Sequence, residues 1–245
     1  MTLMNVIFTA TALGRAHRHC GRGTQDAASL VASPDGRVAA AAVADGCSAG
    51  ARSEVGAGLG ARFVCAAAVR RVRAGVPLAE LPHVVIADLV DELAHLARAL
   101  DGGDLARVIE EHLLFTVHAI VVAADEGVVF GVGDGVVSID GHARVIDQGA
   151  APDYPAYALF PSMAAPRVLV HHLGPFASAA VATDGAHEVL ADLAAFEREE
   201  RFVRNPSLAQ KRMRAWCDTG GGPVDDCTIA VVRTAPPLDE LLVRP

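Results

Sequence analysis

Seven small apolar residues, from Val38 to Ala44, lead directly into Asp45 and Gly46. A continuous apolar run of this length, followed by a turn signal, predicts a strand that is buried on both faces. A carboxylate is costly to bury unless it is paired, hydrogen-bonded or bound to a metal. The run therefore predicts a sheet that is covered on both sides, and it makes Asp45, at the end of the strand, the candidate centre of a metal site.

The composition of the chain excludes several classes of partner. The 245 residues carry a net charge of -8 without a basic stripe, so a nucleic-acid partner is not expected. No apolar run approaches the roughly 18 residues that span a bilayer, so no membrane partner is expected either. The N-terminal residues lack an early basic region and are typical of a strand, not of a signal peptide. The five cysteines, an odd number without a CxxC pair, indicate reduced thiols and a cytoplasmic protein.

Periodicity and turn residues predict one domain over residues 1–235, followed by a flexible tail over 236–245. Strands are expected over residues 3–10, 27–32, 38–44, 116–123, 128–132, 136–139, 143–146, 168–171, 177–183 and 227–233. Helices are expected over residues 51–73, 77–100, 105–114, 187–198 and 208–217, and Pro82 marks the true start of the second one. The four strands between residues 116 and 146 are expected to form one meander. Residues 148–166 have no period and predict a surface loop or flap.

Three glycines, Gly56, Gly58 and Gly60, lie inside the first predicted helix. Each costs about 1 kcal/mol of helix stability relative to alanine. Close packing of the helix on a sheet would offset that cost, and we expect this packing here.

Asp-Gly pairs occur six times in the chain, and the usual role of such a pair is a tight turn. Asp35-Gly36 and Asp140-Gly141 fit that role, because each stands between short alternating strands. Asp45-Gly46 and Asp184-Gly185 do not, because each follows an apolar run and precedes a predicted helix. The carboxylates of these last two pairs are therefore candidates for a shared cation.

Two more carboxylates are expected at the same edge of the fold. Asp226 opens the last predicted strand, and Asp26 opens the strand that pairs with the Asp45 strand. Strand starts and strand ends can meet at one edge of an antiparallel sandwich. A ligand set made only of oxygen atoms favours Mg²⁺ or Mn²⁺ over zinc. A carboxylate that bridges two such ions places them about 3.5–4 Å apart, and a water between them becomes a hydroxide-like nucleophile.

Five blocks of the sequence resemble the protein phosphatase 2C family (PPM, the metal-dependent serine/threonine phosphatases) in its bacterial form. They are similar to family blocks in the same order: TQDA at residues 24–27, VADGCSAGARSEVGA at 43–57, GDG at 133–135, ATDGAHEVL at 182–190 and DDCTIAVV at 225–232. The resemblance implies an α+β fold, a four-layer α-β-β-α sandwich of two antiparallel sheets flanked by helices, with the site at one edge.

The resemblance also implies a ligand set and a cofactor, two Mn²⁺ or Mg²⁺ ions together with a third, weaker one. Asp45 would bridge the two metals, and the Gly46 carbonyl would bind one of them. Asp184 and Asp226 would complete the first metal.

By the same resemblance, Asp26 would hold metal-bound waters and Asp134 would contribute to the weaker third metal. The implied reaction is the hydrolysis of phosphoserine or phosphothreonine in a phosphorylated protein, a target of a kinase. A metal-bound hydroxide would attack phosphorus in line, while the metals offset charge on the phosphoryl oxygens. Asp26, Asp45, Asp184 and Asp226 are the residues expected to be catalytic.

The phosphate-binding part departs from the family pattern. Many members carry an arginine five residues before the position of Asp26, where this chain has Gly21. Arg22 and Arg18 are the candidates to bind the phosphate in its place. The usual asparagine after the last aspartate is Cys227 here.

His17, His19 and Cys20 lie in the same loop without matching metal ligands elsewhere in the sequence. A solvated loop, or a histidine that acts as general acid near the phosphate, is favoured over a separate metal cluster.

Two alternatives to an active protein phosphatase stay open. One is a pseudophosphatase, which would bind a phosphoprotein in signalling without hydrolysing it. The missing arginine and Cys227 favour this alternative, and the intact aspartates argue against it. The other is a two-metal phosphohydrolase that acts on a small phosphoester.

Overall fold

The computed structural model describes residues 4–100, 102–149, 151–218 and 222–235, and these residues form two five-stranded antiparallel sheets. The predicted tail over 236–245 lies outside the described residues. In the order of the strands, the first sheet contains β1 (Met4–Ala12), β10 (Cys227–Ala235), β9 (Ser178–Ala182), β6 (Gly135–Ile139) and β7 (His142–Ile146). The second sheet contains β2 (Asp26–Ala32), β3 (Val38–Gly46), β4 (Phe115–Ala123), β5 (Glu126–Val132) and β8 (Leu169–Gly174).

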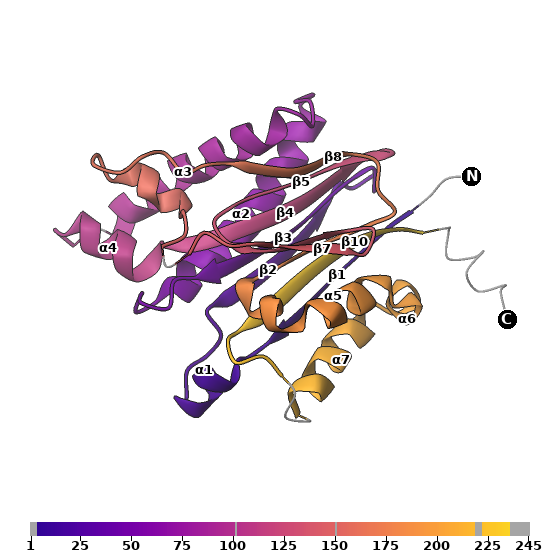
Figure 1. Ribbon diagram of the computed structural model, residues 1–245. Helices are drawn as coiled ribbons and strands as arrows, with labels where there is room; N and C mark the ends of the chain where they lie inside the picture. The colour runs from indigo at the N-terminus through magenta and orange to yellow at the C-terminus, as the bar shows by residue number, and fades with distance from the viewer. Residues whose placement is uncertain (1–3, 101, 150, 219–221, 236–245) are drawn as a thin grey trace, which may run out of the picture.

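Helices cover the outer face of each sheet (Figure 1). The second sheet packs against α2 (Ser53–Arg73) and α3 (Leu81–Leu100), and α4 (Leu105–His112) follows them in the chain. The first sheet packs against α5 (Leu190–Arg198), α6 (Glu200–Arg204) and α7 (Ser207–Asp218). Three short elements complete the list: α1 (Arg15–His19) and the 3-10 helices η1 (Pro155–Leu159) and η2 (Asp184–Val189). The arrangement confirms the predicted four-layer α-β-β-α sandwich.

None of the helices in the described ranges combines the length and the apolar character that a membrane span requires.

The apolar run that ends at Asp45 forms β3, at the second place in its sheet between β2 and β4. Ala40, Ala42 and Ala44 face the core beneath α2 and α3, whereas Ala39 and Ala41 face the opposite sheet. Small side chains suit this position because the strand has packed neighbours on both faces. The prediction of a strand buried on both sides is confirmed, and Asp45 lies where the buried strand reaches the edge.

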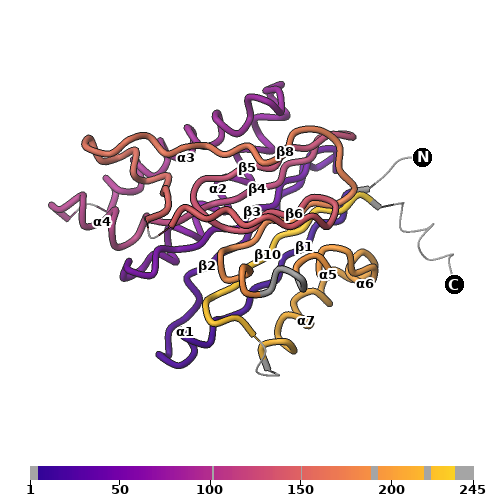
Figure 2. Tube along the Cα trace, viewed as in Figure 1, coloured from indigo at the N-terminus to yellow at the C-terminus, as the bar shows by residue number. Residues whose placement is uncertain are grey.

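The predicted single meander over residues 116–146 is wrong. β4 and β5 pair as a hairpin in the second sheet, but β6 and β7 belong to the first sheet (Figure 2). Gly133 and Gly135 both have positive φ angles, +93° and +151°, which suit glycine. The chain between β5 and β6 therefore crosses from one sheet to the other, and this crossing brings Asp134 to the edge where both sheets end.

The predicted surface loop over residues 148–166 is wrong in part, because its central segment is packed. Tyr154, Pro155 and Ala156 are buried, and η1 lies against α3 and β4. Tyr154 and Ala156 belong to the core beneath α2 and α3. Only the short 3-10 helix η1 of this segment is packed, and it is too short to show a hydrophobic periodicity in the sequence. Periodicity therefore could not reveal that the segment is buried.

The three glycines of α2 differ in their surroundings. A Cβ atom at Gly60 would overlap the ring of Phe115, and one at Gly56 would overlap the carbonyl oxygen of His112. A Cβ atom at Gly58 would have open space around it. Close packing therefore explains two of the three glycines.

This difference predicts opposite effects of the same substitution at two positions two residues apart. Gly60→Ala should lower the free energy of unfolding by about 1–3 kcal/mol, because the fully buried ring of Phe115 must shift within the core to admit the methyl group. Gly58→Ala should raise it by about 0.5–1 kcal/mol through helix propensity alone. Urea unfolding followed by circular dichroism measures both, and a stabilised Gly60→Ala variant would contradict the packing argument.

Candidate metal centre

Strand ends from both sheets meet at one edge and surround a cavity of about 220 Å³. The wall of this cavity is formed by four segments: the end of β3, the crossing before β6, the residues after β9 and the start of β10. The lining consists of His17, Gln25, Asp45, Gly46, Cys47, Ser48, Thr116, Asp134, Gly149, Pro152, Tyr154, Asp184, Asp225 and Asp226. An adjoining hollow of about 330 Å³ shares Asp134, Gly149, Asp184 and Asp225 with it. Four strand-end carboxylates and Asp134 therefore face one small space.

Asp26 and Asp45 are paired residues of neighbouring strands, so their carboxyl groups lie near each other by the register of the sheet. The hydroxyl of Thr183 donates a hydrogen bond to Oδ2 of Asp26 at 2.7 Å. Burial raises the pKa of Asp26 to about 7. The negative charge of Asp226 adds to this increase, and the hydrogen bond from Thr183 opposes it. Burial, with the charges of Asp26 and Asp184, also raises the pKa of Asp45 well above its usual value.

Asp134 and Asp184 extend the same accumulation of negative charge. Burial raises the pKa of Asp134 to about 6, with a further contribution from the charge of Asp184. The pKa of Asp184 is raised by burial and by the charge of Asp225. These carboxylates raise one another's pKa, and a divalent cation among them would remove the repulsion.

Gln25 supplies a second sign that the cavity suits a cation. Its Nε2 group donates to Oγ of Ser53 at 2.6 Å and lies 3.3 Å from the carbonyl oxygen of Cys47. These acceptors fix the orientation of the amide, because a carbonyl oxygen cannot donate. The other amide atom, Oε1, is buried without a hydrogen-bond partner among the described residues, although Gln25 lines the cavity. A cation or a water in its shell would satisfy Oε1, so the donor set fits a hard divalent ion.

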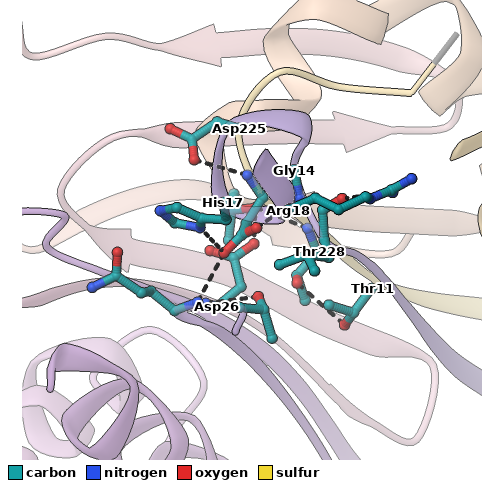
Figure 3. Close-up of polar contacts among 12 residues, drawn as sticks. Thr11, Gly14, His17, Arg18, Asp26, Asp225 and Thr228 are labelled. Carbon is teal, nitrogen blue, oxygen red and sulfur yellow. Dashed lines mark hydrogen bonds and ion pairs between the residues drawn. The ribbon is translucent and has the colours of Figure 1, made fainter. Parts of the chain in front are cut away.

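Asp226 is anchored by three donors from the N-terminal part of the chain. The backbone N–H of Gly14 donates to Oδ1 at 2.7 Å, and that of Gln25 donates to Oδ2 at 2.8 Å. Nδ1 of His17 lies 2.8 Å from Oδ2 and acts as the third donor (Figure 3). The carboxylate of Asp226 is therefore held in one orientation at the start of β10.

His17 and Asp225 also line this cavity; from the sequence His17 was a candidate general acid near the phosphate, and Asp225 had no expected role. Backbone hydrogen bonds from Arg15 to Pro223 and from Ala16 to Val224 pin the start of α1 to the loop before β10. One nitrogen of His17 and one oxygen from each of Asp225 and Asp226 lie within 4.8 Å of one another. His17 is 209 residues from Asp226, and no local pattern signals such a contact. The adjacency of Asp225 to Asp226 was the only available signal for Asp225.

The predicted site residues fall into two groups. Asp45, Gly46, Asp134, Asp184 and Asp226 line the cavity. Asp26 lies directly beside Asp45 on the neighbouring strand.

The two predicted phosphate-binding arginines lie elsewhere. Arg18 and Arg22 are both exposed, and neither belongs to the cavity lining. The guanidinium of Arg18 donates to the carbonyl oxygen of Leu13, and Figure 3 shows this side chain directed away from His17 and Asp225. The structure therefore brings the carboxylates together and leaves both arginines outside.

Known proteins share this sequence pattern and this fold. The family model of protein phosphatase 2C matches residues 13–218. No curated protein matches the sequence. Among solved structures, a bacterial serine phosphatase is similar with a TM-score of 0.57 and 14% sequence identity, over 96% of this chain and 98% of that one.

Two further solved structures have the same fold. A serine/threonine phosphatase from Staphylococcus aureus is similar with a TM-score of 0.57 and 14% identity, over 97% of this chain and 96% of that one. The catalytic domain of the serine/threonine protein phosphatase PstP, in complex with two manganese ions, is similar with a TM-score of 0.54 and 18% identity, over 96% of this chain and all of that one.

Proposed function

This chain belongs to the protein phosphatase 2C family, and on that premise we propose that it is a metal-dependent serine/threonine protein phosphatase. The observation that supports the proposal is the convergence of carboxylates from separate strand ends on one cavity. A pseudophosphatase would have no need to keep four repelling carboxyl groups at one edge, because they destabilise the fold. An active enzyme needs them to hold its cations.

We propose two bound divalent cations, Mn²⁺ or Mg²⁺, with a third as a weaker addition. Asp45 would contact both ions, the Gly46 carbonyl one of them, and Asp184 and Asp226 would complete the first. When bound, the cations would activate a water for attack on phosphorus and offset negative charge on the phosphoryl oxygens. The manganese complex of PstP, a protein with the same fold, supports this assignment.

The side chains around the cations would hold them in place and complete the cavity. Thr183 holds Asp26 through the hydrogen bond to Oδ2, and its Oγ1 also accepts from the backbone N–H of Thr228 at 2.9 Å. This chain of bonds sets the orientation of Asp26, which would hold waters of the metal shell. Asp134 would hold the third cation, and its backbone oxygen lies 2.8 Å from Nε2 of His118.

The substrate of the proposed enzyme is a phosphoserine or phosphothreonine side chain of a protein that a kinase has modified, in the cytoplasm. Phosphate binding by Arg22 or Arg18 stays a prediction. Either arginine would have to turn toward the cavity when a phosphate enters it.

Hydrolysis assays with and without metal test the proposal. The purified protein should hydrolyse p-nitrophenyl phosphate with added Mn²⁺, and a phosphothreonine peptide with a higher kcat/KM, and EDTA should abolish both reactions. Absence of turnover with any divalent ion, together with retained phosphopeptide binding, would instead identify a pseudophosphatase. Turnover of small phosphoesters without turnover of phosphopeptides would identify the second alternative.

A further inference from the structure

The peptide that carries Asp134 lies between the two sheets and belongs to neither. The pairing of β5 with β4 ends at Val132, and the pairing of β6 with β7 begins at Gly135. The two residues between these ends are outside both ladders, whose hydrogen bonds fix the backbone of a strand. The carbonyl oxygen of Asp134 instead lies 2.8 Å from Nε2 of His118, a buried residue of β4. Because Asp134 also lines the cavity, this hydrogen bond is placed to determine where its carboxylate points.

Two glycines make room for the imidazole of His118. Gly131 is the partner of His118 in the neighbouring strand β5, and Gly135 is the first residue of β6. A Cβ atom at Gly135 would overlap Cδ2 and Nε2 of the ring, and one at Gly131 would overlap Nδ1. Nε2 therefore faces the crossing, and Nδ1 faces the backbone of β5. A larger residue at either glycine would displace Nε2 from the carbonyl oxygen that it binds.

The hydrogen bond to the crossing determines which ring nitrogen of His118 carries the proton. A carbonyl oxygen can only accept, so the proton is on Nε2. Burial lowers the pKa of His118 to about 4, so the ring is neutral at pH 7 and Nδ1 keeps its lone pair. This Nδ1 is buried without a hydrogen-bond partner among the described residues. A buried acceptor normally has a partner, either a protein group or a water.

His171 of β8 carries a donor that matches this acceptor. The ring centroids of His171 and His118 are 5.4 Å apart, and β5, which has no side chain at Gly131, separates the two strands that carry them. Nδ1 of His171 lies 3.2 Å from the guanidinium of Arg144, which can only donate, so the proton of the neutral ring is on Nε2. This Nε2 is also buried without a partner in the part of the chain that the structure describes. One water, or a small rotation of either ring, would join the donor to the acceptor.

We propose that His118 is a positioning residue, whose Nε2–H holds the backbone carbonyl of Asp134 and so keeps the carboxylate of that residue in the cavity, and that His171 holds the opposite side of the ring. Neither histidine belongs to the cavity lining, so both act through Asp134. The inference rests on the proposed function only for its consequence, which is the affinity of the third cation that Asp134 would hold.

Backbone ¹⁵N relaxation of the metal-free full chain tests the positioning role without any assay of activity. The amide of Asp134 should have an order parameter of about 0.85 in the parent, and His118→Leu, which removes the donor but keeps an apolar bulk, should lower it below about 0.6. His118→Gln, whose amide nitrogen can take the place of Nε2, should restore the parent value. The amides of β3 are the internal reference and should not change. A parent-like order parameter at Asp134 in His118→Leu would overturn the proposal.

Gly131→Ala is a second variant, which leaves the histidine itself unchanged. The new methyl group should push the ring away from the carbonyl oxygen and lower the order parameter at Asp134, as His118→Leu does. This comparison remains available if His118→Leu does not fold, which urea unfolding checks. An Asp134 amide that stays rigid in Gly131→Ala, although the ring signals of His118 have moved, would also overturn the proposal.

Ring ¹⁵N shifts of the protein labelled with ¹⁵N-histidine test the role of His171. An accepted hydrogen bond moves an unprotonated ring nitrogen upfield, so the Nδ1 signal of His118 should move downfield in His171→Phe. His172→Phe, at the next residue of β8, is the matched control and should leave the signal in place. An unchanged Nδ1 signal in His171→Phe would overturn the role of His171.

Titration with Mn²⁺ connects the inference to the proposed function. His118→Leu should weaken the binding of the last and weakest ion about tenfold, and His118→Gln should restore it to within about threefold of the parent. Equal weakening of every ion in both variants would reflect a general loss of packing and would overturn the specific role of His118. A parent protein that binds no divalent cation but shows the expected order parameters would overturn the proposed function and leave the positioning of Asp134 intact.

Discussion

Replacing Asp45 by asparagine is expected to lower the Mn²⁺-dependent hydrolysis of p-nitrophenyl phosphate by at least about a thousandfold, because both cations would lose a shared anionic ligand. Asparagine has nearly the same size and keeps one acceptor oxygen. It also removes a charge that the carboxylates of Asp26 and Asp184 repel in the metal-free protein. The variant should therefore fold at least as well as the parent, and its loss of activity should not arise from unfolding.

Asp35→Asn is the matched control for Asp45→Asn. Asp35 also precedes a glycine, but its pair forms the exposed turn between β2 and β3, where Oδ1 accepts from the backbone N–H of Arg37 at 3.1 Å. Asparagine can preserve that bond, so the control should keep the parent kcat and KM. Assays of kcat at saturating Mn²⁺, with circular dichroism of each variant, provide the measurement. An Asp45→Asn variant with more than about a tenth of the parent kcat would remove Asp45 from the metal centre, since a bridging ligand contributes more than that.

The ionisation of Asp26 is expected to destabilise the metal-free protein as the pH rises from about 4 to 7. The buried imidazoles of His118 and His171 act in the opposite direction, because their pKa values are lowered to about 4 and about 3. The pKa of Asp26 in the folded protein is raised from 3.8 to about 7 by burial. Between these two values the carboxyl group of Asp26 binds more protons in the folded state than in the unfolded state, so its contribution to stability falls as the pH rises. The stabilising term is fully present below the unfolded pKa and is lost once the pH passes the folded pKa. The upper limit of the loss is on the order of 4 kcal/mol.

Asp26→Asn tests this electrostatic penalty directly. The amide oxygen can still accept from Thr183 but carries no charge, so in EDTA at pH 8 the variant should melt at a higher temperature than the parent. The difference should shrink toward pH 5. With saturating Mn²⁺ the order should reverse, because the parent gains the binding free energy of the metal and the variant gains less.

Asp91→Asn controls for the change in net charge, since Asp91 is an exposed residue of α3. It should shift the melting temperature little, equally with and without metal. An Asp26→Asn variant that melts no higher than the parent in EDTA at pH 8 would show that the carboxylates at this edge do not repel one another as the structure implies.

The carboxylates illustrate how far a sequence can lead toward a site. Asp45 and Asp184 could be singled out because each ends an apolar run and precedes a helix. An aspartate in a hairpin turn is instead followed by a second strand. The structure brings both to one cavity with Asp134 and Asp226. His17 and Gln25 could not be singled out in the same way. Their importance depends on a hydrogen bond to Asp226 from the opposite end of the chain.

The amino-acid sequence by itself determined the local features of this protein: a small-residue strand buried on both faces, the helices that flank it, and the carboxylates at its strand ends. Hydrophobic period and turn chemistry depend on near neighbours in the chain, so they can be read locally. Only the tertiary structure decided that the chain crosses between sheets at Gly133 and that α1 docks beside the start of β10. Sheet membership and docking depend on burial and hydrogen bonds between distant segments, for which the residues of either segment carry no separate signature.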